Sequence, residues 1–435
     1  AGETLRAIHD HGREAGLRVR MLLGSAALAA VVKLVDDLLH ALPRPSLPGG
    51  IGNADFRNLG FSFDPSLLMI GFGAIIGLRA GLSLLLGAVI AWALLLPLAL
   101  ERGWAIAGAP EQNWFGPGVE WLIWPGVSLM TVAALSSLAV TAARRWRLKR
   151  QTTAAARSPF PLPLSVFLPA SLLIIALAMT VQKLYFDIPL AAGVVAVGLS
   201  LFLAIIAGRV VGETGIPPIG AIGKLSQLSF GVVAPGNVTA NLMGANVTGG
   251  AAGQCTDLLD DLKAGAMVGA TPRHQIAAQV IGVLTGSIVG SLTYLALIPD
   301  PANMLLTAEW PAPAVATWKA VAEVLSAGLD TLPPASPAAM LMGGIAGLGL
   351  TLGGLWLPGR APQWLPSGTA LGLAFVIPAW ISISLCLGAV LAALVRHWAP
   401  NWAARFVLAI AAGLVAGESL AGVARALGGL AAAGT

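Results

Sequence analysis

Charged residues are scarce in this 435-residue sequence, making up 10% of the chain against 57% hydrophobic residues. A soluble domain carries about a quarter charged residues, and no soluble fold of this length hides so much apolar surface. A bilayer can accept it, because lipid solvates the outer faces of a helical bundle. The composition therefore excludes a soluble protein and predicts an all-α polytopic membrane protein.

Cysteine is nearly absent, and Cys255 and Cys386 exclude a disulfide framework or a thiolate metal site. The histidines lack metal-ligand spacing, and no Ser/His/Asp set stands out. The segment 220–224 fails as a phosphate-binding loop, because Pro218 and Leu225 stand where Gly and Ser or Thr are needed. The sequence therefore offers no cofactor motif and disfavours an ATP-driven pump.

Basic residues exceed acidic ones, giving a net charge of +5. A nucleic-acid binder would concentrate this charge on an exposed domain, but here it gathers between apolar runs, mainly at 144–157. That is the pattern of a cytoplasmic loop, so we expect the lipid bilayer, and no nucleic acid, as a partner. The Ala-, Gly- and Arg-rich composition favours the inner membrane of a bacterium.

Apolar runs outline the expected helices, since a span needs about 20 residues. The run 66–100 is too long for one perpendicular span and is either two helices broken near Gly77–Gly81 or one long tilted helix. Residues 299–335 predict a long loop with an amphipathic stretch at 316–329, and 209–263 predict broken or re-entrant helices. Single spans are expected at 19–42, 119–142, 159–182, 187–208, 274–298, 336–357, 368–395 and 404–432.

The chain contains an internal repeat. Pro65–Ala91 aligns without gaps to Pro366–Ala392 with 11 of 27 residues identical, which compositional bias does not explain. Duplication is typical of secondary transporters. We therefore expect a duplicated helical bundle, with residues 1–182 as a partial first repeat and 183–435 as the second.

The two repeats differ in what precedes them. The second copy follows the region 187–256, and no such region precedes the first. The N-terminal part of the first repeat is therefore expected to be absent from this chain, unless that half lost it. A weaker match pairs the helix at 19–42 with the one at 274–298.

A polar break interrupts the apolar pattern at 212–227. Pro217 and Pro218 cannot continue a helix, and irregular backbone at membrane depth must be buried in protein or line a cavity. A helix that restarts near Ile219 would point free N–H groups into that cavity. Lys224 and Gln227, three apart, share one face of this helix. With Thr214, Pro217 and Pro218 they are predicted to bind the substrate at a site for a carboxylate. The alternative for Lys224 is a snorkelling surface lysine.

Neutral polar residues follow the break in an otherwise apolar stretch. Asn241, Asn246, Thr248 and Gln254 offer donors and acceptors for a peptide-like or chelate ligand without a large desolvation cost. The alternative for each is hydrogen bonding between helices. We count all four among the predicted substrate-binding residues.

Four segments resemble the oligopeptide transporter (OPT) superfamily: 214–227, 251–265, 366–372 and 413–418. The resemblance is strong over 187–435 and moderate over the first 150 residues. It implies a two-fold duplicated helical bundle that imports oligopeptides or metal chelates, usually with protons.

Ionisable residues in apolar surroundings are functional candidates. Glu418 and Glu213 are the predicted proton-coupling groups; the alternatives are a hydrogen bond to a neighbouring helix for Glu418 and a helix cap for Glu213. An acidic cluster with one lysine is predicted to serve in gating or ion pairing: Asp257, Asp260, Asp261 and Lys263.

The sequence thus predicts a secondary active transporter, not an enzyme, that imports small oligopeptides with protons by alternating access. A metal-chelate importer, for siderophore or nicotianamine-like chelates, is the alternative within the family. An alternative from another class is a membrane-embedded transferase that uses the Asp257 cluster with a divalent metal. A channel or a structural membrane subunit is a third alternative. The oligomeric state is open.

Overall fold

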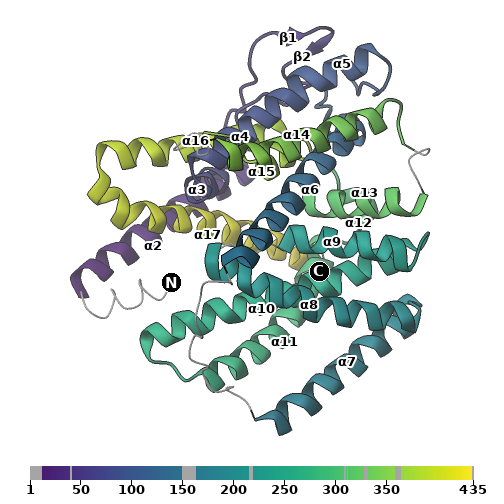
Figure 1. Cartoon of the computed structure of the whole chain (residues 1–435). Helices are drawn as coiled ribbons and strands as arrows, with labels where there is room; N and C mark the ends of the chain where they lie inside the picture. The colour runs from purple at the N-terminus through teal and green to yellow at the C-terminus, as the bar shows by residue number, and fades with distance from the viewer. Residues whose placement is uncertain are drawn as a thin grey trace. The chain divides into compact units, whose positions relative to one another are not determined.

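The computed structural model describes residues 12–39, 42–148, 163–214, 219–307, 310, 312–327, 332–357 and 364–433. Helices dominate these residues, and the sheet among them is a hairpin in which β1 (Gly50–Ile51) pairs antiparallel with β2 (Ala54–Asp55) (Figure 1). The all-α prediction is therefore confirmed. The helices are α2 (Gly12–Leu39), α3 (Leu67–Ile76), α4 (Leu78–Ala88), η1 (a π-helix, Val89–Leu95), α5 (Leu96–Glu101), α6 (Phe115–Leu148), α7 (Leu164–Phe186), α8 (Leu190–Thr214), α9 (Ile219–Val233), α10 (Val238–Val268), α11 (Pro272–Leu297), α12 (Pro301–Met304), α13 (Pro313–Ala327), α14 (Ser336–Trp356), α15 (Gly368–Leu373), α16 (Ala379–Trp398) and α17 (Pro400–Ala433).

Eight of the described helices are long and apolar enough to cross a membrane, which supports a multi-pass arrangement. The predicted span at 19–42 is a helix but is not among the eight, and α2 carries Lys33, Asp36 and Asp37 near its end. The eight are Leu78–Glu101, Phe115–Ser137, Leu164–Phe186, Leu190–Gly208, Pro272–Leu297, Ser336–Trp356, Ala379–Trp398 and Pro400–Arg425.

The chain forms two compact units. Among the described residues, the first unit comprises 134–289 and 318–327, and the second comprises 12–133, 290–317 and 332–433. Both copies of the repeated segment lie in the second unit.

Each copy of the repeat is a short helix, a break and a long helix. In the first copy α3 ends at Gly77, whose φ of 85° favours glycine, and α4 begins at the next residue. In the second copy the break ends at Pro378, which the alignment pairs with Gly77. The two-helix alternative for 66–100 is thus confirmed. The single span predicted over 368–395 is wrong, because Pro378 supplies no N–H to a continuous helix.

The two copies cross at matching positions. Gly87 of α4 lies against the carbonyl of Leu371, and Gly388 of α16 lies against the carbonyl of Ile70. The alignment pairs Gly87 with Gly388 and Ile70 with Leu371, so one contact becomes the other when the copies are exchanged. The repeat therefore folds about a pseudo-two-fold relation within the second unit.

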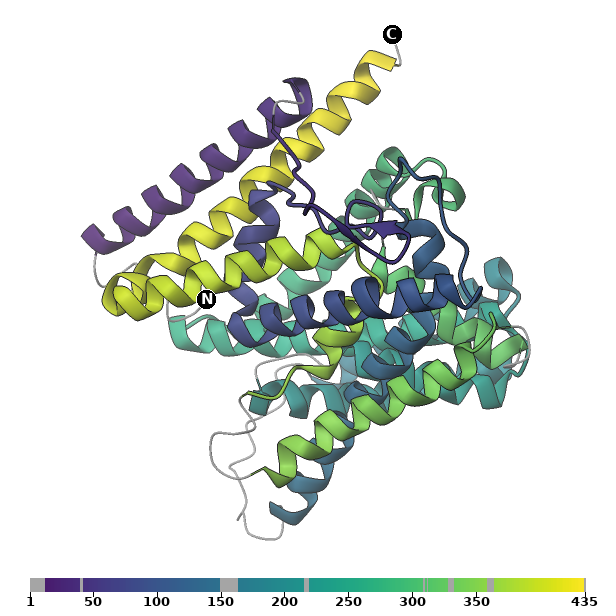
Figure 2. The same cartoon turned by 90° about the horizontal axis from the view of Figure 1, so that it is seen from above.

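The flanking helices follow the same relation. α2 runs beside α17 (Figure 2), where Gly413 and Gly417 lie against the backbone of residues 22–26. Likewise, Gly343 and Gly347 of α14 lie against the backbone of α6. Glycines four apart let two helices approach closely. The contact of α2 with α17 thus resembles that of α14 with α6, and the predicted match of the helix at 19–42 with the one at 274–298 stays a prediction.

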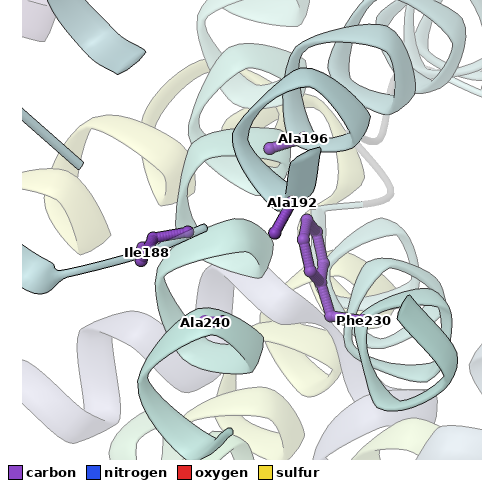
Figure 3. Close-up of a cluster of buried hydrophobic side chains, with 5 residues drawn as sticks. All are labelled: Ile188, Ala192, Ala196, Phe230 and Ala240. Atoms are coloured by element: carbon purple, nitrogen blue, oxygen red, sulfur yellow. The ribbon is translucent and has the colours of Figure 1, made fainter. Parts of the chain in front are cut away.

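The first unit is built on α8, α9 and α10. Small residues let the helices approach, and Figure 3 shows the ring of Phe230 from α9 beside Ala192 of α8, with Ala240 of α10 in the same cluster. α9 begins at Ile219, the predicted restart. The expectation of broken helices through residue 263 is wrong for its last part, because α10 is one helix that starts at the N-cap Asn237.

Candidate functional site

Polar side chains fill the interface between α9 and α10. Lys224 and Gln227 lie on one face of α9, with exposed fractions of 6% and 0%, which confirms their predicted shared face. Gln227 Nε2 donates to the carbonyl of Trp318 at 2.9 Å, and Asn241 Nδ2 donates to the carbonyl of Gln227 at 2.8 Å. Thr248 Oγ1 donates to Ser226 Oγ at 2.6 Å. Asn241 and Thr248 therefore join helices, as the alternative interpretation has it.

Three groups in this polar core have no partner among the residues that the structure describes. Gln227 Oε1 and Asn241 Oδ1 are buried and accept no hydrogen bond from those residues. The Lys224 ammonium forms no ion pair within the described part of the chain. Burying an ammonium without an anion is costly, so the core holds a donor and two acceptors that a polar solute would satisfy.

The other predicted binding residues lie elsewhere. Asn246 and Gln254 are exposed on the opposite face of α10, and Gln254 Oε1 accepts from Gln279 Nε2 at 3.3 Å. Thr214 and Glu213 belong to the last turn of α8, but their side chains lie outside the described residues. The predicted binding residues Pro217 and Pro218 also fall outside them.

The acidic cluster is exposed along α10. None of its four members forms an ion pair among the residues that the structure describes, so a gating role stays a prediction. Over the same residues, no three His, Cys, Asp or Glu side chains gather as a metal site. The members are Asp257, Asp260, Asp261 and Lys263.

Glu418 belongs to the second unit, whereas the polar core belongs to the first. Its carboxylate is 9% exposed and sits at the amino end of α3. Ser66 Oγ donates to Oε1 at 2.8 Å, and the Leu68 N–H donates to Oε2 at 2.7 Å. A carboxylate is stabilised there by free N–H groups and by the helix dipole. Glu418 is therefore a helix cap in this structure, and proton coupling stays a prediction for it.

A cavity of about 1020 Å³ opens beside this carboxylate, entirely within the second unit. Its walls carry both signs of charge, with cations from Lys33, Arg44 and Arg57. Sequence reasoning chose only Glu418 among the residues that line it. The available signal was the grouping of several charges within residues 33–64 of a chain that is 10% charged. The lining carboxylates are Asp36, Asp64, Glu111 and Glu418.

An arginine holds one wall of the cavity. Arg44 Nη2 lies 2.5 Å from Asp36 Oδ2, and Arg44 Nε lies 3.4 Å from Asp64 Oδ1. The hydrogen bond with Asp36 raises the pKa of Arg44. Burial raises the pKa of Asp64, because desolvation penalises its charged form more than Arg44 favours it. The arginine thus links the end of α2 to the residues that precede α3.

A buried asparagine joins the two loops of the opposite wall. Asn58, 4% exposed, donates through Nδ2 to the carbonyls of Pro110 at 2.7 Å and Gln112 at 2.8 Å. Its own carbonyl accepts from the Trp114 N–H at 2.8 Å. The segments 43–63 and 102–114 are therefore fixed to each other at the cavity.

Comparison with known proteins agrees with this architecture. The family model for the OPT oligopeptide transporter protein matches residues 2–428. A putative oligopeptide transporter of Saccharomyces cerevisiae, YGL114W, is 28% identical over 55% of this chain and 41% of its own length. Two metal-nicotianamine transporters each match 83% of this chain: the probable transporter YSL9 of rice, 25% identical over 56% of its length, and YSL2 of Arabidopsis thaliana, 26% identical over 59%.

The chain spans about half the length of the curated relatives it matches. The family match itself runs through both units and both copies of the repeat. The chain therefore belongs to the OPT oligopeptide transporter family.

Proposed function

We propose that the protein is a secondary active transporter that imports small oligopeptides with protons by alternating access. The observation that carries the proposal is the pair of broken helices, α3–α4 and α15–α16, which exchange contacts about a pseudo-two-fold relation. Secondary transporters are commonly built from such repeats and place solute sites at discontinuous helices. The name of the yeast relative supports oligopeptides as the solute class.

Uptake of a metal chelate is the second candidate. It is favoured by the plant relatives, which are named for metal-nicotianamine and match more of this chain than the yeast protein does. Both solute classes carry carboxylates and amines. The polar core of the first unit suits either, because Lys224 offers a cation while Gln227 and Asn241 offer free acceptors.

Residue roles follow from these contacts. Lys224 is proposed to anchor a carboxylate of the solute, with Gln227 and Asn241 beside it. Glu418 is proposed to couple protons, since protonation would remove an acceptor from the amino end of α3 and loosen that helix. Glu213 is the second proposed proton carrier.

Uptake into proteoliposomes with an inward proton gradient tests the transport proposal. Labelled tri- to pentapeptides and an iron chelate are offered to the unmodified protein, to Lys224→Ala and to Lys319→Ala. Lys319 is the matched control, because it lies in the same unit but pairs with Glu323 at an exposed surface.

Gradient-dependent uptake that is lost in Lys224→Ala and kept in Lys319→Ala would support the proposal. The solute that accumulates decides between peptide and chelate. Folded protein that accumulates none of these solutes would contradict the transport proposal and favour the channel or enzyme alternatives.

A further inference from the structure

Two charged side chains of the cavity have no partner in the described part of the chain. Arg57 and Glu111 are exposed, and neither side chain forms a hydrogen bond or ion pair within the described ranges. The five other charged groups of the lining are all engaged: Lys33 with Asp37, Asp36 and Asp64 with Arg44, and Glu418 with Ser66. Over the described residues, the cavity therefore presents one free cation and one free carboxylate.

The loops that carry these two groups are held in place. Arg57 directly precedes Asn58, and Glu111 lies between the two residues whose carbonyls accept from Asn58 Nδ2. Asn113 adds a long contact, donating through Nδ2 to the Arg57 carbonyl at 3.4 Å. Trp380 and Met69 supply apolar surface to the same cavity. A ligand would meet a preformed wall, which reduces the entropy lost on binding.

We propose that this cavity is a binding site for a zwitterionic solute, in which Arg57 holds the carboxylate and Glu111 holds the ammonium group. This site deepens the proposed function, on which it rests, and lies in a different unit from the Lys224 core. A guanidinium pairs with a carboxylate through two parallel hydrogen bonds. A volume of about 1020 Å³ is at the upper end of the range for small-molecule sites, which suits a short peptide.

The cavity lies on the side where an imported solute arrives. The basic residues at 144–157, which begin in the last turns of α6, assign the carboxyl end of this helix to the cytoplasm. Glu111 and Asn113 immediately precede its amino end, so they belong on the opposite side. The site is therefore placed to receive a solute from the non-cytoplasmic side.

Equilibrium binding of trialanine to the full chain in detergent, measured by calorimetry, tests the site. The comparison ligands are N-acetyl-trialanine, which lacks the ammonium group, and trialanine amide, which lacks the carboxylate. Each block is expected to weaken binding to the unmodified protein about tenfold, because each removes one of the two charged groups that the cavity is proposed to hold.

The variants assign each end of the ligand to one residue. Arg57→Gln should weaken trialanine binding about tenfold. In this variant trialanine amide should bind no more weakly than trialanine, because the partner of the carboxylate is already gone. N-acetyl-trialanine should still bind more weakly than trialanine. Glu111→Gln should show the reverse pattern. Arg102→Gln and Glu120→Gln are the matched controls, because both residues are exposed and outside the cavity. They should bind trialanine as the unmodified protein does.

Two results would overturn the site. One is binding of trialanine that neither cavity variant weakens, in which case the solute binds elsewhere and the transport proposal is untouched. The other is no binding of trialanine by folded protein that accumulates peptides in proteoliposomes. Failure of the transport proposal gives a different result. In that case trialanine still binds and the binding depends on Arg57 and Glu111, but the proteoliposomes accumulate no peptide.

Discussion

The amino ends of α3 and α15 are equivalent in the repeat but differ in what surrounds them. Both begin with a serine whose Oγ accepts a backbone N–H three residues on, from Met69 to Ser66 at 3.2 Å and from Ala370 to Ser367 at 3.4 Å. At α3, Glu418 adds a carboxylate cap. At α15, the methyl group of Ala133 lies against the first turn instead.

The connections after the two long helices differ as well. Residues 102–114 join α5 to α6 and help to enclose the charged cavity, whereas Ala399 alone joins α16 to α17. Features that both copies share, the serine caps and the crossing glycines, build the fold. Features present at one copy only, Glu418 and the longer loop, gather around the cavity and mark the copy that has become specialised.

The crossing glycines should show the largest effects. Gly87→Ala and Gly388→Ala each place a methyl group where a carbonyl of the other copy already lies. Overpacking of this kind costs about 1–3 kcal/mol. We expect both variants to lose thermal stability in detergent by similar amounts, because exchange of the copies converts one contact into the other.

Open-space glycines provide the control for that experiment. Gly282→Ala and Gly422→Ala add a methyl group to α11 and α17 with nothing nearby, and should melt as the unmodified protein does. If only one of the two crossing variants were destabilised, the two copies would not be equivalent at their crossing.

The carboxylate cap should show the next effect. Glu418→Ala removes the acceptor of the Leu68 N–H and of the Ser66 hydroxyl, and leaving buried donors unsatisfied costs about 1–3 kcal/mol. Glu418→Gln keeps one acceptor oxygen and should lose less. Denaturant or thermal melting in detergent measures both, and equal stability of all three proteins would refute the cap.

Much of this architecture could be predicted from sequence, and the limits have physical reasons. The identities between residues 65–91 and 366–392 revealed the repeat, and they include the serine caps and Gly87 and Gly388 at the helix crossing. The Pro378 break was missed because the run 368–395 is apolar throughout, and hydropathy does not register a missing N–H.

The candidate site was only partly predictable. Lys224 and Gln227 share a buried face because residues three apart on a helix must do so. The charged cavity brings together residue 33 and residue 418, and no local pattern relates positions so far apart. Both Asn241 and Asn246 were predicted to bind substrate, but Asn241 is buried in α10 and Asn246 is exposed. Composition alone did not distinguish the two faces of this helix.

The serine caps should show a smaller effect that still separates the two copies. Ser367→Ala and Ser66→Ala each remove an N-cap, at a cost of about 1 kcal/mol. Ser66 also donates to Glu418, so Ser66→Ala should cost more. The Ser66→Ala and Glu418→Ala double mutant should lose less than the sum of the single losses. Additive losses would mean that the hydrogen bond between the two side chains contributes nothing.

The arginines that tether the two entry segments should show the smallest effect on stability. Arg44 pairs with Asp64 before α3, and Arg79 Nε donates to the Leu365 carbonyl before α15 at 2.8 Å. Because the Arg44 side chain is 51% exposed, Arg44→Gln should cost less than about 1 kcal/mol. Its effect should appear instead in hydrogen exchange, as faster exchange in residues 45–64 with 364–367 unchanged. Arg79→Gln should give the opposite pattern, because each tether holds a different copy of the repeat. Faster exchange in both segments from either variant would mean that the two entry segments open together, and the division between a structural copy and a specialised copy would then fail.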